Sequence, residues 1–444
     1  METIFANATA PGKAGVSIVR ISGEKAGEAL TWLTKKPLPE PRKAEFTKII
    51  NPETGEIIDE IIAIYFPAPY SFTGEDIVEL HLHGSAAIIS EVLGYLAGLP
   101  SLRLAQPGEF SRRAFENGKM DLTQIEGLAD LIDAETEIQK KQAMRQMQGE
   151  LSEFYESWRK KLISIMANIE AYIDFPDEDI PESTDVKMQS EVSELVAKIK
   201  KHLSDRRGEI IREGINAVIL GAPNVGKSSL MNHLSRRDVA IVSATAGTTR
   251  DVIEVHMNIG GMPVTLTDTA GIRESSDEIE TEGIKRALSR AELADIKIGI
   301  FDANNYPEVD EKTAALLTKN DIAVINKIDE TPLKGAEING LEARCISITT
   351  GENTDKLIAE LETKIANIAS PSSDPLATRK RHRAELEKCV DALERFLEGR
   401  KNKIDIELCA EELRLAAKSL GRIIGNIDVE DILDEIFSSF CIGK

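Results

Sequence analysis

The stretch Gly221-Ala-Pro-Asn-Val-Gly-Lys-Ser228 follows the β-branched run Asn216–Leu220 and precedes a helical pattern that begins near Ser229. It matches the spacing G-x-x-x-x-G-K-[ST], in which glycines let the backbone wrap around phosphates and a helix N-terminus directs N–H groups at negative charge. Lys227 is then expected to lie against the β and γ phosphates, and Ser228 to hold Mg²⁺ through its hydroxyl. The stretch therefore predicts a strand, a phosphate-binding loop and a helix in succession.

Residues 212–373 around this loop alternate between short β-branched runs and helical patterns. Such alternation predicts a mainly parallel sheet with helices on both faces. The expected strands are Asn216–Leu220, Val252–Ile259, Pro263–Thr267, Lys297–Phe301, Ile322–Ile325 and Arg344–Ile348.

Two further motifs stand at the ends of expected strands. Asp268-Thr-Ala-Gly271 follows Pro263–Thr267, so a carboxylate can join the Mg²⁺ shell and the Gly271 N–H can reach the γ-phosphate. Asn326-Lys-Ile-Asp329 follows Ile322–Ile325, and an aspartate there can accept hydrogen bonds from guanine N1 and N2, which adenine cannot supply. Each motif alone is weak, but their order and spacing predict a GTPase of the translation-factor type.

Three departures from the common pattern affect this prediction. The guanine-side loop reads Ser347-Ile-Thr349 instead of Ser-Ala-Lys; its contact is mostly through the backbone, so GTP binding is still expected. Ile272 stands where Ras-like enzymes carry the glutamine that orients the attacking water. The segment Ala244–Arg250 offers Thr249 to Mg²⁺ and many oxygens to another cation, and with Asn224 it indicates a monovalent cation in the place of an arginine finger.

The flanking regions have different patterns. Residues 1–118 predict an α+β domain with strands at Gly15–Ser22, Ile57–Phe66 and Asp76–His83 and one helix near Ala86–Leu96. Residues 119–211 and 374–444 are helical, so one discontinuous helical domain is expected, with the GTPase domain (212–373) inserted into it. The helical period is seen in Leu151, Phe154, Tyr155, Trp158, Leu162 and Ile165.

Length and composition exclude several classes of protein. A chain of 444 residues is too long for a single core, and a net charge of −21 excludes a general nucleic-acid binder. Its four cysteines, at positions 345, 389, 409 and 441, form no CxxC pair and indicate a reducing compartment. No apolar run is long enough to cross a bilayer, and the N-terminus lacks the features of a secretion signal. We therefore expect a cytoplasmic protein without a membrane partner.

The chain closely resembles the MnmE (TrmE) family of tRNA-modifying GTPases over essentially its whole length. The specific segments are Pro11–Gly23 (PGKAGVSIVRISG), Tyr70–Gly84 (YSFTGEDIVELHLHG), Arg113–Gln124 (RAFENGKMDLTQ), Thr245–Arg250 (TAGTTR) and Phe440–Lys444 (FCIGK). The resemblance implies a multidomain α/β protein: a folate-binding α+β N-terminal domain, a discontinuous helical domain and an inserted Ras-like P-loop GTPase domain.

The resemblance also implies an activity and partners. The family forms a homodimer through its N-terminal domains and works with the FAD protein MnmG (GidA) in a heterotetramer. Together they add an aminomethyl or carboxymethylaminomethyl group at C5 of wobble uridine 34 in certain tRNAs. The one-carbon unit comes from a tetrahydrofolate derivative, either 5,10-methylenetetrahydrofolate or 5-formyltetrahydrofolate. GTP hydrolysis in the family needs Mg²⁺ and K⁺-assisted pairing of two GTPase domains.

Matching the family motifs residue by residue assigns further roles. Glu280 corresponds to the acidic residue that orients the attacking water; on its own it would be read as a solvated carboxylate at a helix start. The matched metal positions are Ser228 and Thr249 for Mg²⁺ and Asn224, Ser243, Thr245 and Thr248 for K⁺. The matched folate positions are Arg20, Glu79, Lys119 and Lys444. GTP contacts are expected from Asn224, Val225, Gly226, Lys227, Ser228, Ser229, Ser243, Ala244, Thr245, Ala246, Gly247, Thr248, Thr249, Asp268, Thr269, Ala270, Gly271, Asn326, Lys327 and Asp329.

The folate assignment is chemically reasonable, because Arg and Lys can pair with the glutamate carboxylates of folate while a Glu accepts from pterin N–H groups. Cys441 stands fourth from the end, but Gly443 and Lys444 do not fit a prenylation signal, and a small buried packing residue is expected instead. His81 and His83 share one face of a strand, and structural roles are favoured over a metal pair.

The sequence is also compatible with a second class of function. A ribosome-assembly GTPase would use its GTP state only to recruit a partner. Such proteins typically append basic RNA-binding domains, whereas this chain appends acidic helices and a folate-type domain. The sequence therefore favours tRNA modification.

Overall fold

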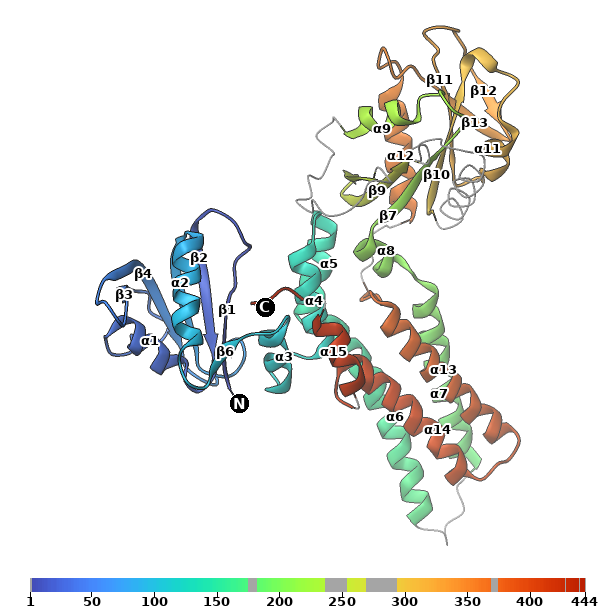
Figure 1. The fold of residues 1–444 in the computed structure, drawn as a ribbon. Coiled ribbons are helices and arrows are strands. Elements are labelled where there is room, and N and C mark those ends of the chain that lie inside the picture. Colours follow the sequence, from blue (N-terminus) through green and yellow to red (C-terminus); the bar gives the residue numbers. More distant parts are fainter. Residues whose placement is uncertain are drawn as a thin grey trace, which may run out of the picture. The chain divides into compact units, whose positions relative to one another are not determined.

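The computed structural model describes residues 2–174, 182–235, 254–268, 294–368, 374–427, 429–438 and 440–443. The chain divides into two compact units (Figure 1). The first unit comprises residues 1–129, 155–163 and 417–444, and the second comprises residues 130–154 and 164–416. Within the described residues, no helix has both the length and the apolar character needed to span a membrane.

The first unit is built on a six-stranded sheet with strand order β3-β4-β5-β2-β1-β6. Alternate residues such as Val78, Leu80 and Leu82 point to one face, where helices α1 (Ala26–Thr34) and α2 (Ala86–Ala97) cover them (Figure 1). The strands are β1 (Thr3–Asn7), β2 (Ala14–Ser22), β3 (Glu45–Ile50), β4 (Ile57–Phe66), β5 (Ile77–Gly84) and β6 (Leu102–Leu104).

The three strands expected here are confirmed to within one residue, but the expectation of one helix is wrong. Besides α2, the region contains α1 and α3 (Glu109–Glu116). Helix α1 is short, and no side chain caps its first turn, so its sequence carries no clear start signal. It is stabilised by burial, because Leu30 and Leu33 lie in the core of the sheet.

Helices complete the first unit. Leu122 and Ile125 of α4 (Leu122–Asp133) pack against Leu433 and Phe437 of α15 (Glu430–Ser438). Helix α6 (Glu150–Asp174) buries Tyr155 and the other apolar positions of its period, except Phe154, which is half-buried. The helical period of the sequence is thus confirmed as a core-facing stripe.

The helices of the second unit bring together segments from either side of its sheet. Helices α7 (Glu182–Ser204) and α13 (Lys380–Lys401) pack along each other and are joined by the ion pairs Lys200–Glu394 (2.5 Å) and Arg400–Asp185 (3.1 Å). The other helices here are α5 (Glu137–Met147), α8 (Arg207–Glu213) and α14 (Ile406–Ile424), of which α14 continues into the first unit.

The second unit contains a seven-stranded sheet with order β12-β13-β11-β10-β7-β9-β8. Its interior pairs are parallel, and the two edge strands, β8 and β12, pair antiparallel. Helices α9 (Lys227–Ser235) and α12 (Thr354–Ile368) pack on one face, and α11 (Glu311–Leu316) lies on the other. The strands are β7 (Ile215–Leu220), β8 (Glu254–Ile259), β9 (Met262–Asp268), β10 (Ile296–Asp302), β11 (Ile322–Asn326), β12 (Ala336–Ile338) and β13 (Leu341–Cys345).

The mainly parallel sheet with helices on both faces is confirmed. The expected last strand, Arg344–Ile348, is misplaced, because β13 ends at Cys345 and Ser347 and Ile348 belong to the following loop. Ile346 donates its N–H to Ile325 O, but the Ile348 N–H turns to a side chain instead of continuing the ladder. The antiparallel edge strand β12 was not expected either.

Candidate functional site

The phosphate-binding loop joins β7 to α9. Asn224 adopts a left-handed conformation (φ 63°), and Lys227 donates from Nζ to the carbonyl oxygens of Gly221 (2.7 Å) and Ala222 (2.8 Å). Burial lowers the pKa of Lys227 from its usual value, while the negative charges of Asp268 and Asp310 oppose that shift. An ammonium group held in this way favours an anion, so the loop suits a phosphate chain.

Two of the residues expected at the Mg²⁺ site, Ser228 and Asp268, lie in contact. Ser228 at the start of α9 donates from Oγ to Oδ2 of Asp268, which ends β9, over 2.8 Å. Asp268 is only 2% exposed. A hydroxyl and a carboxylate oxygen that converge beside a phosphate-binding loop are the hard ligands that Mg²⁺ prefers.

The guanine-side loop is held to the phosphate loop by Asn326. Its Nδ2 donates to Val225 O (2.9 Å), and its Oδ1 accepts from the N–H of Ile348 (3.1 Å). A Cβ at Gly226 would collide with this amide nitrogen, so the approach requires glycine. The Ser347-Ile-Thr349 loop is thus linked to the phosphate loop through Asn326 and the backbone N–H of Ile348.

The base-recognition turn follows directly. Lys327 is left-handed (φ 70°), and the exposed Asp329 comes two residues later. Lys327 Nζ donates to Oδ2 of Asp302 at the end of β10 over 2.6 Å. Asp302 was not among the expected site residues, because it stands alone after a strand and belongs to none of the motifs.

Several expected site residues lie outside the described residues. They are Ser243, Ala244, Thr245, Ala246, Gly247, Thr248, Thr249, Thr269, Ala270, Gly271, Glu280 and Lys444. The structure therefore brings together Asn224–Ser229, Asp268 and Asn326–Asp329.

A second group of expected residues lies on the first unit's sheet. Arg20 of β2 donates from Nε (3.0 Å) and Nη2 (2.8 Å) to Oε1 of Glu79, its neighbour on β5. The guanidinium also lies over the rings of Phe72 and Phe110, 5.7 and 5.8 Å from their centroids. Lys119 donates from Nζ to the carbonyl of Pro69 (2.9 Å). Arg20 and Glu79 thus form one polar centre bordered by aromatic rings.

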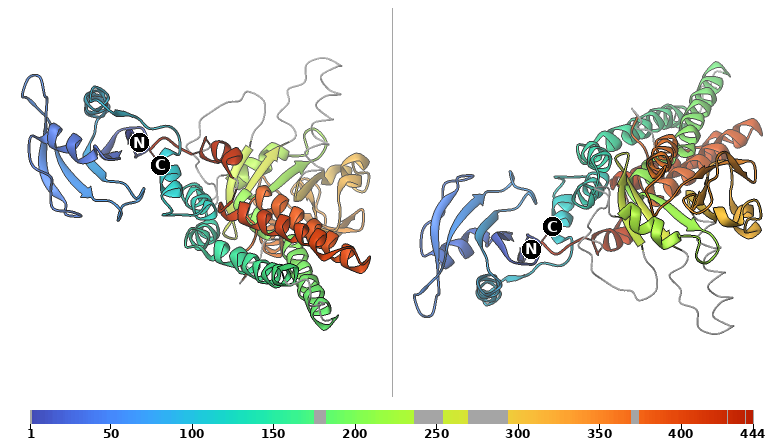
Figure 2. Two further views of the ribbon diagram at one scale, coloured as in Figure 1. Left: turned by 90° about the horizontal axis from the view of Figure 1, so that it is seen from below. Right: turned by 90° about the horizontal axis from the view of Figure 1, so that it is seen from above.

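The C-terminal segment reaches the same unit's sheet, as both views of Figure 2 show. Cys441 O accepts from the N–H of Gly108 (3.4 Å), and Ile442 forms an antiparallel bridge with Pro107. Gly443 is buried with φ 97°, and a Cβ there would collide with Asn7 O. The expectation that Cys441 is buried is wrong: its side chain is exposed, because Gly443 makes the close approach.

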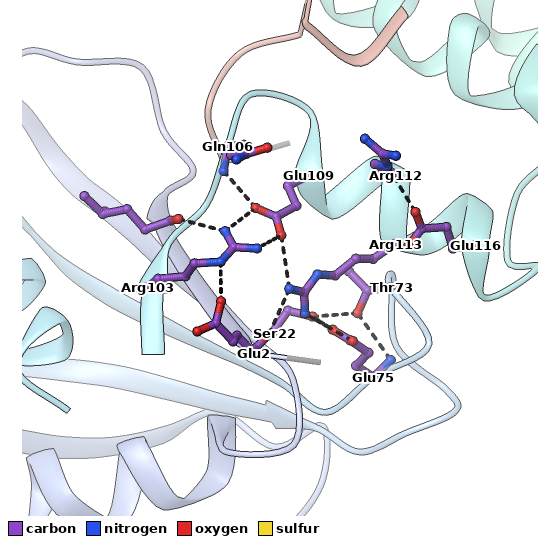
Figure 3. Close-up of polar contacts among 11 residues, drawn as sticks. Glu2, Ser22, Thr73, Glu75, Arg103, Gln106, Glu109, Arg112, Arg113 and Glu116 are labelled. Carbon is purple, nitrogen blue, oxygen red and sulfur yellow. Dashed lines mark hydrogen bonds and ion pairs between the residues drawn. The ribbon is translucent and has the colours of Figure 1, made fainter. Parts of the chain in front are cut away.

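A buried ion network anchors helix α3 near this segment (Figure 3). Arg113, 4% exposed, donates to Oε2 of Glu75 (2.9 Å), to Oε1 of Glu109 (3.1 Å) and to Glu2 O (2.8 Å). Arg103 holds the same Glu109 carboxylate through two further bonds of 2.6 and 2.8 Å. These bonds, with backbone N–H donation from Gln106, outweigh the effect of burial and lower the pKa of Glu109. Sequence reasoning missed the network, because two of its members, Glu2 and Glu75, lie far in the chain from the segment 103–113 that supplies the others.

The two histidines of β5 have separate acidic neighbours. His83 Nδ1 lies 2.7 Å from Oδ1 of the buried Asp59, and His81 Nε2 lies 3.6 Å from Oε2 of Glu79. Across the residues that the structure describes, no three His, Cys, Asp or Glu side chains gather in a way that could hold a metal ion.

A parallel sheet with a phosphate-binding loop after β7, a Ser–Asp pair for Mg²⁺ and an Asn-Lys-x-Asp turn defines a P-loop GTPase. Comparison with known proteins narrows this class. Residues 122–441 match the family described as the MnmE helical domain, and residues 3–119 match the GTP-binding protein TrmE N-terminus. The chain belongs to the MnmE family.

Named relatives support the family assignment over the whole length of the chain. The chain is 50% identical to proteins of Paramagnetospirillum magneticum and Parvibaculum lavamentivorans and 47% identical to one of Rickettsia bellii. Each alignment covers 100% of this chain and 100% of the relative. All three relatives carry the name tRNA modification GTPase MnmE.

Proposed function

We propose that this protein is a K⁺-activated, Mg²⁺-dependent GTP hydrolase that acts with the FAD protein MnmG on tRNA. The pair would add an aminomethyl or carboxymethylaminomethyl group at C5 of wobble uridine 34, with a tetrahydrofolate derivative as one-carbon donor. The observation that carries the proposal is the assembled nucleotide site in a chain that matches tRNA modification GTPases from end to end.

The proposal of GTP and Mg²⁺ binding is supported by the chemistry of the residues that meet at the nucleotide site. Lys227 would bind the β and γ phosphates, Ser228 and Asp268 would hold Mg²⁺, and Asp329 would accept from guanine. When bound, Mg²⁺ neutralises charge that develops on the phosphates. Thr249 is the second Mg²⁺ position, and Glu280 would orient the attacking water. Asn224, whose backbone is left-handed, would offer its side-chain carbonyl to K⁺, together with Ser243, Thr245 and Thr248.

The folate part rests on the polar centre in the first unit. Glu79 presents a carboxylate that is held by Arg20, and the rings of Phe72 and Phe110 offer apolar surface beside it. A pterin ring needs both an acceptor for its N–H groups and flat apolar neighbours. Lys119 and Lys444 would supply cations for the glutamate carboxylates.

The proposed assembly is a homodimer through the N-terminal domain, residues 1–118. The sheet face that α1 and α2 leave uncovered carries two apolar side chains opposite each other on β3 and β4, Phe46 (64% exposed) and Ile62 (43% exposed). Exposed apolar patches of this kind commonly mark a protein interface. The remaining proposed domains are 119–211 and 374–444, which are helical, and 212–373, the inserted GTPase domain, whose sheet and helices are contiguous in the chain.

GTP hydrolysis by the purified protein tests the K⁺ requirement. Turnover should fall sharply when K⁺ is replaced by Na⁺, whose smaller radius suits oxygens spaced for K⁺ poorly. The matched control is nucleotide binding, which should change much less than turnover between the two salts, because Lys227, Mg²⁺ and Asp329 would bind the nucleotide in either salt. Equal turnover in K⁺ and Na⁺ would refute K⁺ activation.

A further inference from the structure

Two loops lie side by side at the guanine end of the second sheet. β10 and β11 are parallel neighbours, and their last residues, Asp302 and Asn326, stand opposite each other in register. The chain after β10 forms the 3₁₀ turn η1 (Ala303–Asn305), and the chain after β11 forms the turn that carries Asp329. Because parallel strands end at one edge, the two loops are free to bond to each other.

Three side-chain contacts join these loops. Lys327 donates to Asp302 (2.6 Å), Asn304 donates from Nδ2 to Oε2 of Glu330 (2.7 Å), and Thr331 donates from Oγ1 to Oδ1 of Asn304 (2.5 Å). Asp302 also caps η1 by accepting from the N–H of Asn304 (3.0 Å). We call these five residues the loop clamp: Asp302, Asn304, Lys327, Glu330 and Thr331.

The residues on either side of Asp329 in the chain are held by hydrogen bonds. On the inner side of the turn, the carbonyl of Lys327 accepts from the N–H groups of Glu330 (3.0 Å) and Thr331 (3.2 Å). On the outer side, the same two residues and Lys327 are bonded to the η1 loop. The left-handed backbone at Lys327 is a conformation that lysine seldom adopts, so the contacts around it contribute to holding it. The contacts therefore fix a turn that the sequence alone does not favour.

We propose that Asp302 and Asn304 are positioning residues that determine specificity for guanine. They hold the turn so that the Asp329 carboxylate faces the base edge before a nucleotide binds. A fixed acceptor gains more from the two guanine donors, because none of the binding free energy goes into ordering the turn. The phosphate contacts come from another loop and do not depend on the loop clamp.

The test compares GDP with IDP on the full-length protein by fluorescence titration. Inosine lacks the 2-amino group, so the difference between the two affinities reports how well the turn reads that group. Asp302→Asn and Asn304→Ala should each weaken GDP binding about tenfold, the scale of one charge-assisted hydrogen bond, and weaken IDP binding less. The preference for GDP over IDP should therefore narrow.

Asp295→Asn is the matched control. The exposed Asp295, just before β10, accepts from the N–H of Asn216 (2.9 Å) at the opposite end of the parallel strands, so the variant also replaces a carboxylate acceptor but does not touch the turn. Its preference for GDP over IDP should stay at the parent value. A uniform loss of affinity for both nucleotides in Asp302→Asn and Asn304→Ala, or no loss at all, would overturn the proposal.

A second measurement asks whether Asp302 acts through Lys327. In a Lys327→Met background, adding Asp302→Asn should change GDP affinity little, because the contact it removes is already absent. Fully additive losses would show that Asp302 acts by another route and would overturn this part. If Asp302→Asn does not fold, as its melting curve would show, Asn304→Ala decides the question, since that side chain is exposed.

Discussion

Asn326 shows how one side chain can set the geometry of a nucleotide site. Its amide bonds to the phosphate loop through Val225 O and to the guanine-side loop through the Ile348 N–H. An aspartate at this position could accept but not donate, so one of the two loops would lose its contact. A Cβ at Gly226 would also collide with this amide nitrogen, so the close approach is a second reason for glycine there, besides its φ of 108°.

Glu280→Ala separates binding from chemistry at the residue scale. The residue belongs to neither the phosphate loop nor the base turn, so GTP affinity should stay nearly unchanged. Hydrolysis should slow by roughly 10²-fold or more, the scale of losing a group that orients the attacking water. Single-turnover hydrolysis and nucleotide titration on one preparation measure both quantities. A variant that hydrolyses GTP at the parent rate would leave Glu280 as an ordinary solvated carboxylate.

The phosphate loop and the Asn326–Asp329 turn follow their strands as predicted, because each of these motifs is contiguous and its chemistry is local. Asp302 and Arg113 were not predicted. Asp302 acquires its partner only because β10 and β11 are adjacent, and Arg113 acquires Glu75 only because α3 packs on the first sheet. Such partners depend on tertiary packing, which residue spacing does not encode.

At the scale of elements, the parallel strands β7, β10 and β11 were predicted well because each is a short, mostly apolar and mostly buried run. The last strand was misplaced because its prediction relied on the same apolar, β-branched pattern. Ile346 and Ile348 continue a β-like run, but Ile348 bonds to Asn326 and lies in the nucleotide site instead of the sheet. Helix α1 was missed because tertiary burial, and not a start signal, stabilises it.

The pairing of α7 and α13 makes stability depend on pH through His202. Burial lowers the pKa of His202 from 6.5 to about 4, and its ring lies 5.3 Å from that of Phe154. The unfolded chain binds a proton near pH 6.5, so between that pH and about 4 it holds more protons than the folded chain. The contribution is complete above pH 6.5 and is lost as the pH falls. The charged groups nearby are Asp205, Asp374, His382 and Arg383.

His202→Phe should therefore flatten the pH dependence of unfolding. Chemical unfolding at pH 7 and pH 5 should show the parent losing up to about 2 kcal/mol more than the variant, at 1.36 kcal/mol for each pH unit. The comparison between parent and variant removes the contribution of other groups. Parallel losses in the two proteins would show that His202 does not titrate as described.

At the scale of the whole molecule, the C-terminal residues belong to the same compact unit as the N-terminal sheet. Two proposed folate residues, Arg20 and Glu79, come from that sheet, and Lys444 follows the docked Gly443. Gly108 contacts both α15 and the C-terminal segment. A Cβ at Gly108 would lie 2.6 Å from Phe437 O, and its N–H donates to Cys441 O. The tail is thus positioned by the fold and is not a free end.

Gly443→Ala tests this docking. The added Cβ would collide with Asn7 O at a left-handed φ, so the tail should move and affinity for 5-formyltetrahydrofolate should fall at least about tenfold. GTP hydrolysis should be unchanged, because the nucleotide site lies in the other unit. Ile442→Ala is the control, since that side chain is 56% exposed. Calorimetric titration would contradict a shared folate site if Gly443→Ala bound folate like the parent.

The central claim is that GTP hydrolysis by this chain is used for tRNA modification. Mass spectrometry of tRNA nucleosides tests it most directly, in a strain that lacks the gene and carries either the parent or Ser228→Ala, which loses the hydroxyl paired with Asp268. We predict that the deletion strain lacks the C5-modified wobble uridine, that the parent restores it, and that Ser228→Ala does not. Full modification in the deletion strain, or full restoration by Ser228→Ala, would contradict the account.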